Sequence, residues 1–245
     1  MRQSNLYTIV FIIITSLVAA LILSVSSTML KERQERNAEL DVKKNILYAV
    51  NLLKKDSDPE KLYKDYIRSF VVNSEGKVLE KSSPAEKINF ERELEKQPGD
   101  REYPVFMSIS DKDGKISAYC IPIVGKGLWS TLYGYLALET DLKTIKGISF
   151  YKHAETPGLG GEIENPEFQR NFYGKKILSE SGELVSVTVL KGKTRPNSPT
   201  LIHEVDGISG ATLTSNGVNK LLKNCLTIYE PYFKTIRSKT IRTGE

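Results

Sequence analysis

The sequence predicts an α+β protein, with a single N-terminal transmembrane helix followed by a domain that mixes helices and strands. The first observation is a run without charged residues from Leu6 to Ser27. The second is that strand patterns and helix patterns follow it without the regular alternation of a doubly wound sheet. In addition, no GxGxxG segment follows a predicted strand, so a Rossmann nicotinamide site is not indicated.

The N-terminal apolar run is long enough to cross a bilayer. At a rise of about 1.5 Å per residue it is about 33 Å long as a helix, and a bilayer core is about 30 Å thick. A cleavable signal peptide is the alternative, but its apolar region is usually only about 7–15 residues long. We therefore expect a retained anchor. The charges beside the run do not settle which end of the helix faces the cytoplasm, because Arg2 precedes the run and a basic cluster beginning at Lys31 follows it.

Helical patterns occur at four places after the apolar run. Residues 31–55 are charged and then amphipathic, with apolar residues at helical spacing from Ile46 onward. The pairs Asp58-Pro59 and Asn165-Pro166 each place a capping side chain before a proline, which is typical of a helix start. Residues 218–233 predict a closing helix.

Strand patterns fill most of the chain between these helices. Turn signals at 73–76 and 111–114 predict two hairpins. The predicted strands are 70–72, 78–79, 106–109, 116–123, 132–139, 147–153 and 184–190.

Composition excludes several functional classes. The formal net charge is +5, and no basic stripe interleaved with aromatic residues is present, which argues against a nucleic-acid partner. The two cysteines, Cys120 and Cys225, are far apart, and buried thiols are favoured over one disulfide. Because there is no CxxC pair, the chain alone is not expected to hold an iron–sulfur or zinc site. No Ser-His-Asp or Cys-His arrangement is legible, so we expect no catalytic residue and no metal site.

The segment Asp206-Gly-Ile-Ser-Gly-Ala-Thr-Leu-Thr-Ser215 is the most informative part of the chain. Its glycines, Gly207 and Gly210, supply the adaptable backbone that a hydroxyl needs if another enzyme is to reach it. An ordinary helix start is also compatible, with Thr214 or Ser215 as the N-cap.

Two glycine-containing segments precede it. One runs from His153 to Gly161 and reads His-Ala-Glu-Thr-Pro-Gly-Leu-Gly-Gly, a loop whose backbone can approach a flat ligand. The other begins Gly125-Lys-Gly-Leu-Trp-Ser and holds the only tryptophan of the chain, Trp129. An aromatic face there can stack on a ring, although a core tryptophan is the plainer reading.

Together the three segments resemble the covalent FMN-binding domain family, and within it the C subunits of Na⁺-translocating NADH:quinone oxidoreductases. In that family a separate flavin transferase joins FMN to the threonine of the pattern Asp-x-x-Ser/Thr-Gly-Ala-Thr. Here the pattern is filled by Asp206, Ser209, Gly210, Ala211 and Thr212. The GKGLWS…YGYLAL segment favours the C subunits over their paralogues, the G subunits of the Rnf ferredoxin:NAD complex.

The resemblance implies an electron-transfer subunit with FMN held covalently by a phosphodiester to Thr212. It also implies the other subunits of a membrane redox complex as partners, a flavin transferase for maturation, and a bacterial inner membrane with the soluble domain on its outer side. A G subunit of an Rnf-type ferredoxin:NAD complex remains the alternative within this class, and a membrane-tethered flavin sensor or assembly module without turnover remains the alternative from another class. The implied FMN-binding residues are Gly127, Trp129, Glu155, Thr156, Gly158, Leu159, Gly160, Asp206, Ser209, Gly210, Ala211, Thr212, Leu213 and Thr214.

The expected domain organisation follows from these interpretations. Residues 1–28 form the membrane anchor and residues 29–110 the membrane-proximal helices and strands. Residues 111–237 form the FMN-binding domain, and residues 238–245 form a basic tail.

Overall fold

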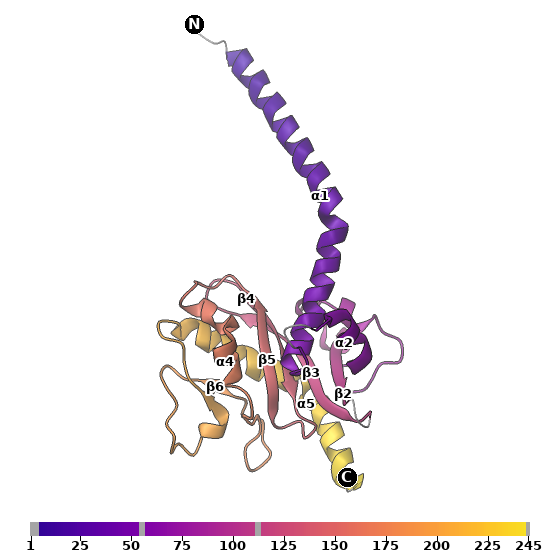
Figure 1. Ribbon diagram of the computed structural model, residues 1–245, viewed down its shortest axis with the longest axis vertical. Coiled ribbons are helices and arrows are strands. Elements are labelled where there is room, and N and C mark those ends of the chain that lie inside the picture. Colours follow the sequence, from indigo (N-terminus) through magenta and orange to yellow (C-terminus); the bar gives the residue numbers. More distant parts are fainter. Residues whose placement is uncertain (1–4, 54–56, 111–113, 244–245) are drawn as a thin grey trace. The chain divides into compact units, whose positions relative to one another are not determined.

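The computed structural model describes residues 5–53, 57–110 and 114–243 (Figure 1). The chain forms two compact units, Met1–Asp41 and Val42–Glu245. The predicted turn at 111–114 lies mostly outside the described residues. The expected boundary between residues 110 and 111 stays a prediction, although strands from both sides of it join one sheet.

The first unit consists of the N-terminal part of helix α1 (Asn5–Ala49). Within the described part of the chain, α1 is the one helix long and apolar enough to cross a membrane, with a mean hydropathy of 2.8 in its most apolar window. Its large apolar side chains from Leu6 to Leu30 are exposed. The prediction of one apolar helix at the N-terminus is therefore confirmed.

The second unit is built on a five-stranded antiparallel sheet, which confirms the predicted α+β class. The strands lie in chain order: β1 (Ile67–Val72), β2 (Tyr103–Ile109), β3 (Ile116–Lys126), β4 (Thr131–Leu138) and β5 (Ile145–Lys152). A second, two-stranded parallel sheet pairs β6 (Thr188–Val189) with β7 (Glu204–Val205). The predicted hairpin of 106–109 with 116–123 is confirmed by the β2–β3 register.

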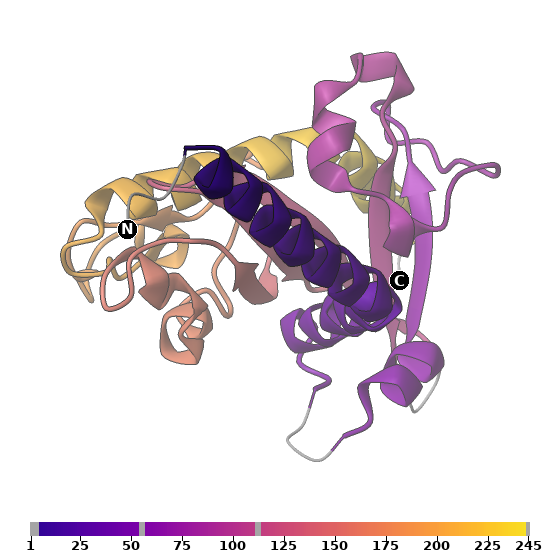
Figure 2. The same ribbon diagram turned by 90° about the horizontal axis from the view of Figure 1, so that it is seen from above.

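Helices cover both faces of the large sheet because side chains alternate along each strand. On β3, Ile121 and Ile123 belong to the core formed with helix α5 (Thr212–Thr243), which Figure 2 shows running beside the sheet. Ala118 and Cys120 belong to a second core with the last turn of α1, which supplies Ile46, and with α2 (Pro59–Tyr66).

The capping signals of the sequence are confirmed. Asp58 accepts hydrogen bonds from the first amides of α2, and Asn165 accepts one from Glu167 at the start of α4 (Pro166–Arg170). The remaining helices are α3 (Phe90–Glu95) and the short 3₁₀ helices η1 (Ala85–Lys87), η2 (Pro98–Asp100), η3 (Gly160–Glu164) and η4 (Leu201–His203).

Two predicted strands are wrong in extent. Residues 78–79 make only a bridge, between Val78 and Val72. In place of a strand at 184–190 the structure has only β6, because Ser186 has a φ of 70° and the backbone leaves the extended conformation. The amide and carbonyl of Val189 bond instead to the side chain of Asn219 on α5.

The closing helix begins earlier than predicted. Helix α5 starts at Thr212, so Thr214 and Ser215 lie buried in its first turn and are not its N-caps. The residue before the helix is Ala211, whose carbonyl accepts a hydrogen bond from the Ser215 amide. Thr212 therefore lies at a helix N-terminus and not within a free loop.

Candidate functional site

Three segments far apart in the sequence form one pocket of about 120 Å³. They are the loop 127–130 between β3 and β4, the loop after β5, and the approach to α5 with its first turn. The residues that line the pocket are Leu128, Trp129, Glu155, Thr156, Leu159, Gly160, Gly210, Ala211, Thr212, Leu213 and Thr214.

The first turn of α5 gives Thr212 its surroundings. Thr212 as a whole is half-buried. The first amides of any α-helix lack an acceptor within the helix, and Ala211 has no side-chain oxygen to cap them. This end of the helix therefore carries unsatisfied N–H groups and a partial positive charge beside Thr212.

Glu155 lies buried at the junction of the three segments, with 5% of its surface exposed. Its Oε1 accepts hydrogen bonds from the amides of Trp129 (2.9 Å) and Ser130 (3.2 Å). Its Oε2 accepts one from the Leu128 amide (3.2 Å) and one from the Thr214 hydroxyl (2.6 Å). Burial alone would raise the pKa of Glu155, but these bonds outweigh burial and lower it.

Glycines make these close approaches possible. A Cβ at position 127 would lie 2.6 Å from Oε1 of Glu155, and one at position 160 would press against the hydroxyl oxygen of Thr214. Gly210 has a φ of +73°, which disfavours any other residue, and a Cβ there would lie 2.7 Å from Cδ2 of Leu159.

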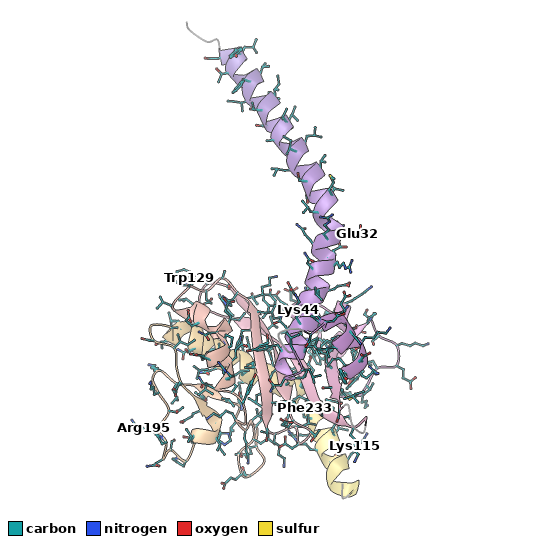
Figure 3. All side chains as sticks on the ribbon, viewed as in Figure 1. Glu32, Lys44, Lys115, Trp129, Arg195 and Phe233 are labelled. Carbon is teal, nitrogen blue, oxygen red and sulfur yellow. The ribbon has the colours of Figure 1, made fainter. Side chains whose placement is uncertain are left out.

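The rim of the pocket is apolar and open to solvent. Trp129 is 70% exposed and Leu213 is 60% exposed, and Leu128 and Leu159 are also exposed. Figure 3 shows Trp129 at the outer edge of the second unit. Large apolar side chains around one hollow are typical of a ligand or interaction site.

Four of the predicted site residues do not line the pocket. Asp206 accepts hydrogen bonds from the amide and hydroxyl of Thr194, which hold the pKa of Asp206 below its usual value. Ser209 is exposed. A Cβ at Gly127 would meet the pocket residue Glu155, and Gly158 turns the 153–161 loop with a φ of +73°.

Two residues of the site were missed by sequence reasoning. Leu128 lines the pocket. Ser130 donates its amide to Glu155 and accepts a hydrogen bond from the Ala154 amide at its Oγ (2.7 Å). Both adjoin Trp129 in the GKGLWS segment, so their position next to a named residue was the only available signal.

The other polar candidates, His153, Cys120 and Cys225, do not line the pocket. His153 is buried after β5, where its Nδ1 accepts a hydrogen bond from the Glu155 amide. Cys120 and Cys225 are free and buried, which confirms the expectation of buried thiols. Burial raises the pKa of the Cys225 thiol to about 12, so it is unreactive near neutral pH.

Comparison with known proteins places this pocket in a family. A family model for the FMN-binding domain matches residues 127–227. The chain is 34% identical to the C subunit of the Na⁺-translocating NADH-quinone reductase of Haemophilus ducreyi, over 88% of this chain and 87% of that protein. It is 35% identical to the corresponding C subunit of Vibrio anguillarum, over 86% of each chain.

A solved structure gives the same result. The crystal structure of the C subunit of the Na⁺-translocating NADH-quinone reductase from Parabacteroides distasonis aligns with a TM-score of 0.71 and 36% identity, covering 83% of this chain and 96% of that one. Sequence relatives and the structural neighbour therefore agree on one protein family. The chain belongs to the family of C subunits of the Na⁺-translocating NADH-quinone reductase.

Proposed function

We propose that this chain carries FMN, joined through a phosphodiester to Thr212, and passes electrons within a Na⁺-translocating NADH:quinone oxidoreductase. The observation that carries the proposal is that the three segments named from the sequence converge around Thr212. Family membership supports a place in a multi-subunit NADH-quinone reductase.

The surroundings of Thr212 suit a phosphate. A helix N-terminus offers N–H groups and a favourable dipole to an anion, and α5 begins at the acceptor residue itself. Thr212 is half-buried and not fully enclosed, so a flavin transferase that brings an activated FMN could approach it. The Thr212 oxygen would bond to the phosphorus of FMN as the bond from that phosphorus to the activating group breaks. The activating group and the hydroxyl proton would leave with the transferase, and the ring of the flavin would stay unmodified.

The pocket suits only part of a flavin ring. Its volume of about 120 Å³ is small beside the roughly 300–1,000 Å³ of typical ligand clefts. A ring resting between Trp129 and Leu213 would thus stay open to solvent on one side. A covalent tether prevents its loss, because rebinding becomes intramolecular at an effective concentration on the order of mM.

When bound, FMN supplies reversible electron acceptance and donation. The chain supplies the attachment point at Thr212 and apolar contacts from Trp129, Leu159 and Leu213. Glu155 is not free to act as a base, since both of its oxygens already accept bonds from the protein. We therefore assign the chain no bond-making chemistry of its own.

The cofactor is tested by intact mass after coexpression with a flavin transferase. We expect one covalent FMN and a fluorescent band that survives denaturing electrophoresis. Thr212→Ala should lose both, whereas Thr227→Ala, on an exposed position of the same helix, should keep them. Flavin that persists in Thr212→Ala, or maps to Thr214, contradicts the assignment.

The relay is tested in the assembled complex. Thr212→Ala should abolish NADH-driven quinone reduction and leave NADH oxidation by artificial acceptors largely intact. Full quinone reductase activity in that variant would leave only a structural or sensing role.

We also propose that α1 anchors the chain in a bacterial inner membrane, with the large unit on the periplasmic side. A reporter that works only after export, fused behind Glu245, should then be active. Activity of a cytoplasm-specific reporter alone would reverse this topology.

A further inference from the structure

We propose that Glu155 is a positioning residue that clamps the loop 127–130, called here the Trp129 loop, onto the first turn of α5 and thereby fixes the walls around Thr212. The consequence for flavin attachment rests on the function proposed above. The clamp itself is a statement about the protein without any cofactor.

The four hydrogen bonds of Glu155 join elements that the chain separates widely. Three of them hold consecutive amides of the Trp129 loop, and the fourth holds the hydroxyl of Thr214, which is 59 residues away along the sequence. One carboxylate therefore links a strand connection to a helix N-terminus. Thr214 is buried, so its hydroxyl has no access to water as an alternative partner.

Besides this carboxylate the Trp129 loop has few attachments. At its start the backbone lies against α5, where a Cβ at Gly217 would come 3.1 Å from Cα of Gly127. The indole of Trp129 is 70% exposed and gains little from packing. Gly127 adds backbone freedom, and the loop's own bond is the single one from the Gly127 amide to the Ser130 carbonyl (2.8 Å). The bond from the Ala154 amide to Ser130 Oγ adds one attachment, at the last residue of the loop.

The charge of Glu155 is what lets it hold so many donors. Only an ionised carboxylate offers acceptor sites on both oxygens and no donor, so it can take three amides and a hydroxyl together. A glutamine in its place would turn an N–H₂ group toward N–H donors. The N-terminus of α5 also favours a negative charge at this point.

The only tryptophan of the chain lies in the clamped loop, so its fluorescence reports on the clamp directly. The test uses the full chain in detergent, made without flavin transferase. Thr214→Val replaces the hydroxyl by a methyl group of similar size, and Glu155→Gln removes the charge. We expect both to increase the fast local motion of Trp129 in time-resolved anisotropy, while Thr214→Ser keeps the restrained signal.

Control variants separate the clamp from general damage. Thr227→Val is the same substitution at an exposed position of α5, and Glu180→Gln is the same charge removal at an exposed turn. Both should match the wild type. Unfolding midpoints recorded on the same samples show whether Glu155→Gln still folds. If it does not fold, Thr214→Val, the milder variant, decides the test.

Flavin loading is then measured on the same variants with a transferase present. We expect loading of Thr214→Val and Glu155→Gln to slow by about tenfold or more, which is the effect of losing one bond to a charged group. Unchanged Trp129 motion in both variants overturns the clamp. If Trp129 moves more freely in the two variants but the wild type never takes up flavin, the clamp is supported and the proposed function is overturned.

Discussion

Glu155 is a buried anion whose four hydrogen-bond partners are neutral donors. The stability of the folded chain should therefore depend on pH in the acid range. The pKa of this carboxyl is lowered in the folded chain, because the Thr214 hydroxyl and three amides outweigh burial. Because the pKa of this carboxyl is lower in the folded chain than in the unfolded chain, its ionised form stabilises the folded chain. This stabilisation is complete above the unfolded-state pKa of about 4.3. It is lost as the pH falls through the lowered folded-state pKa.

We therefore expect wild type and Glu155→Gln to differ in unfolding free energy by a constant amount between about pH 7 and pH 5, and by a shrinking amount below about pH 4. Urea denaturation followed by circular dichroism measures the difference at each pH. A difference that stays constant into strong acid would show that the carboxylate is not the stabilising form.

Gly160 supports the same junction by having no side chain. Gly160→Ala places a methyl group against Thr214 and Glu155, and we expect a loss of about 1–3 kcal/mol in unfolding free energy from overpacking. Gly99→Ala is the matched control, because a Cβ there meets nothing within 4 Å. Equal stability of the two variants in urea denaturation would contradict the tight contact.

The sequence predicted Thr212 and Glu155 unequally well. Thr212 follows from a local pattern that can be read along the chain. Glu155 was expected to contact flavin, whereas its bond to Thr214 depends on how the 153–161 loop meets α5. A contact across 59 residues has no local signature, so sequence reasoning could name Glu155 as a flavin contact, which stays a prediction, but not its bond to Thr214.

At the scale of elements, α5 acts as a scaffold for segments that lack regular pairing of their own. Asn219 bonds both the amide (2.7 Å) and the carbonyl (3.0 Å) of Val189, where the sequence predicted a longer strand. The caps at Asp58 and Asn165 were predictable because each capping side chain lies within three residues of the amides that bond to it. The shortening of the predicted strand was not predictable, since the group that bonds Val189 is a side chain on a helix distant in the sequence.

Asn219→Ala should free both groups of Val189. We expect a loss of about 1–3 kcal/mol in unfolding free energy and faster hydrogen exchange at the Val189 amide. Asn216→Ala, on an exposed position of α5, should change neither quantity. Unaltered exchange at Val189 in Asn219→Ala would mean that another group holds this segment.

At the scale of the whole molecule, the two buried cores draw their fully buried side chains from Ile46 onward, within the second unit. The exposed apolar side chains of α1 from Leu6 to Leu30 contribute nothing to them. Loops and sheet order of the second unit were only partly predictable, since pairing depends on contacts between distant strands. The single span was predictable because its length and lack of charge are properties of one continuous segment.

A chain beginning at Lys31 should therefore be soluble without detergent and unfold in one cooperative transition, because the core stays complete. Size-exclusion chromatography and thermal unfolding by circular dichroism provide the measurement. Aggregation of the shortened chain in detergent-free buffer would show that the span contributes to folding.

The 59-residue separation between Glu155 and Thr214 also sets an order of events during biosynthesis. Ribosomes make the chain from its N-terminus, and α5 begins at residue 212 of 245. The Trp129 loop and the 153–161 loop are thus made before the first turn of α5, which completes the pocket. The pocket is incomplete until the first turn of α5 has been made and has docked, so Thr212, the acceptor proposed above, would become a substrate for the transferase only after that step. Flavin attachment at this position would then mark chains in which α5 has docked and pass over those in which it has not.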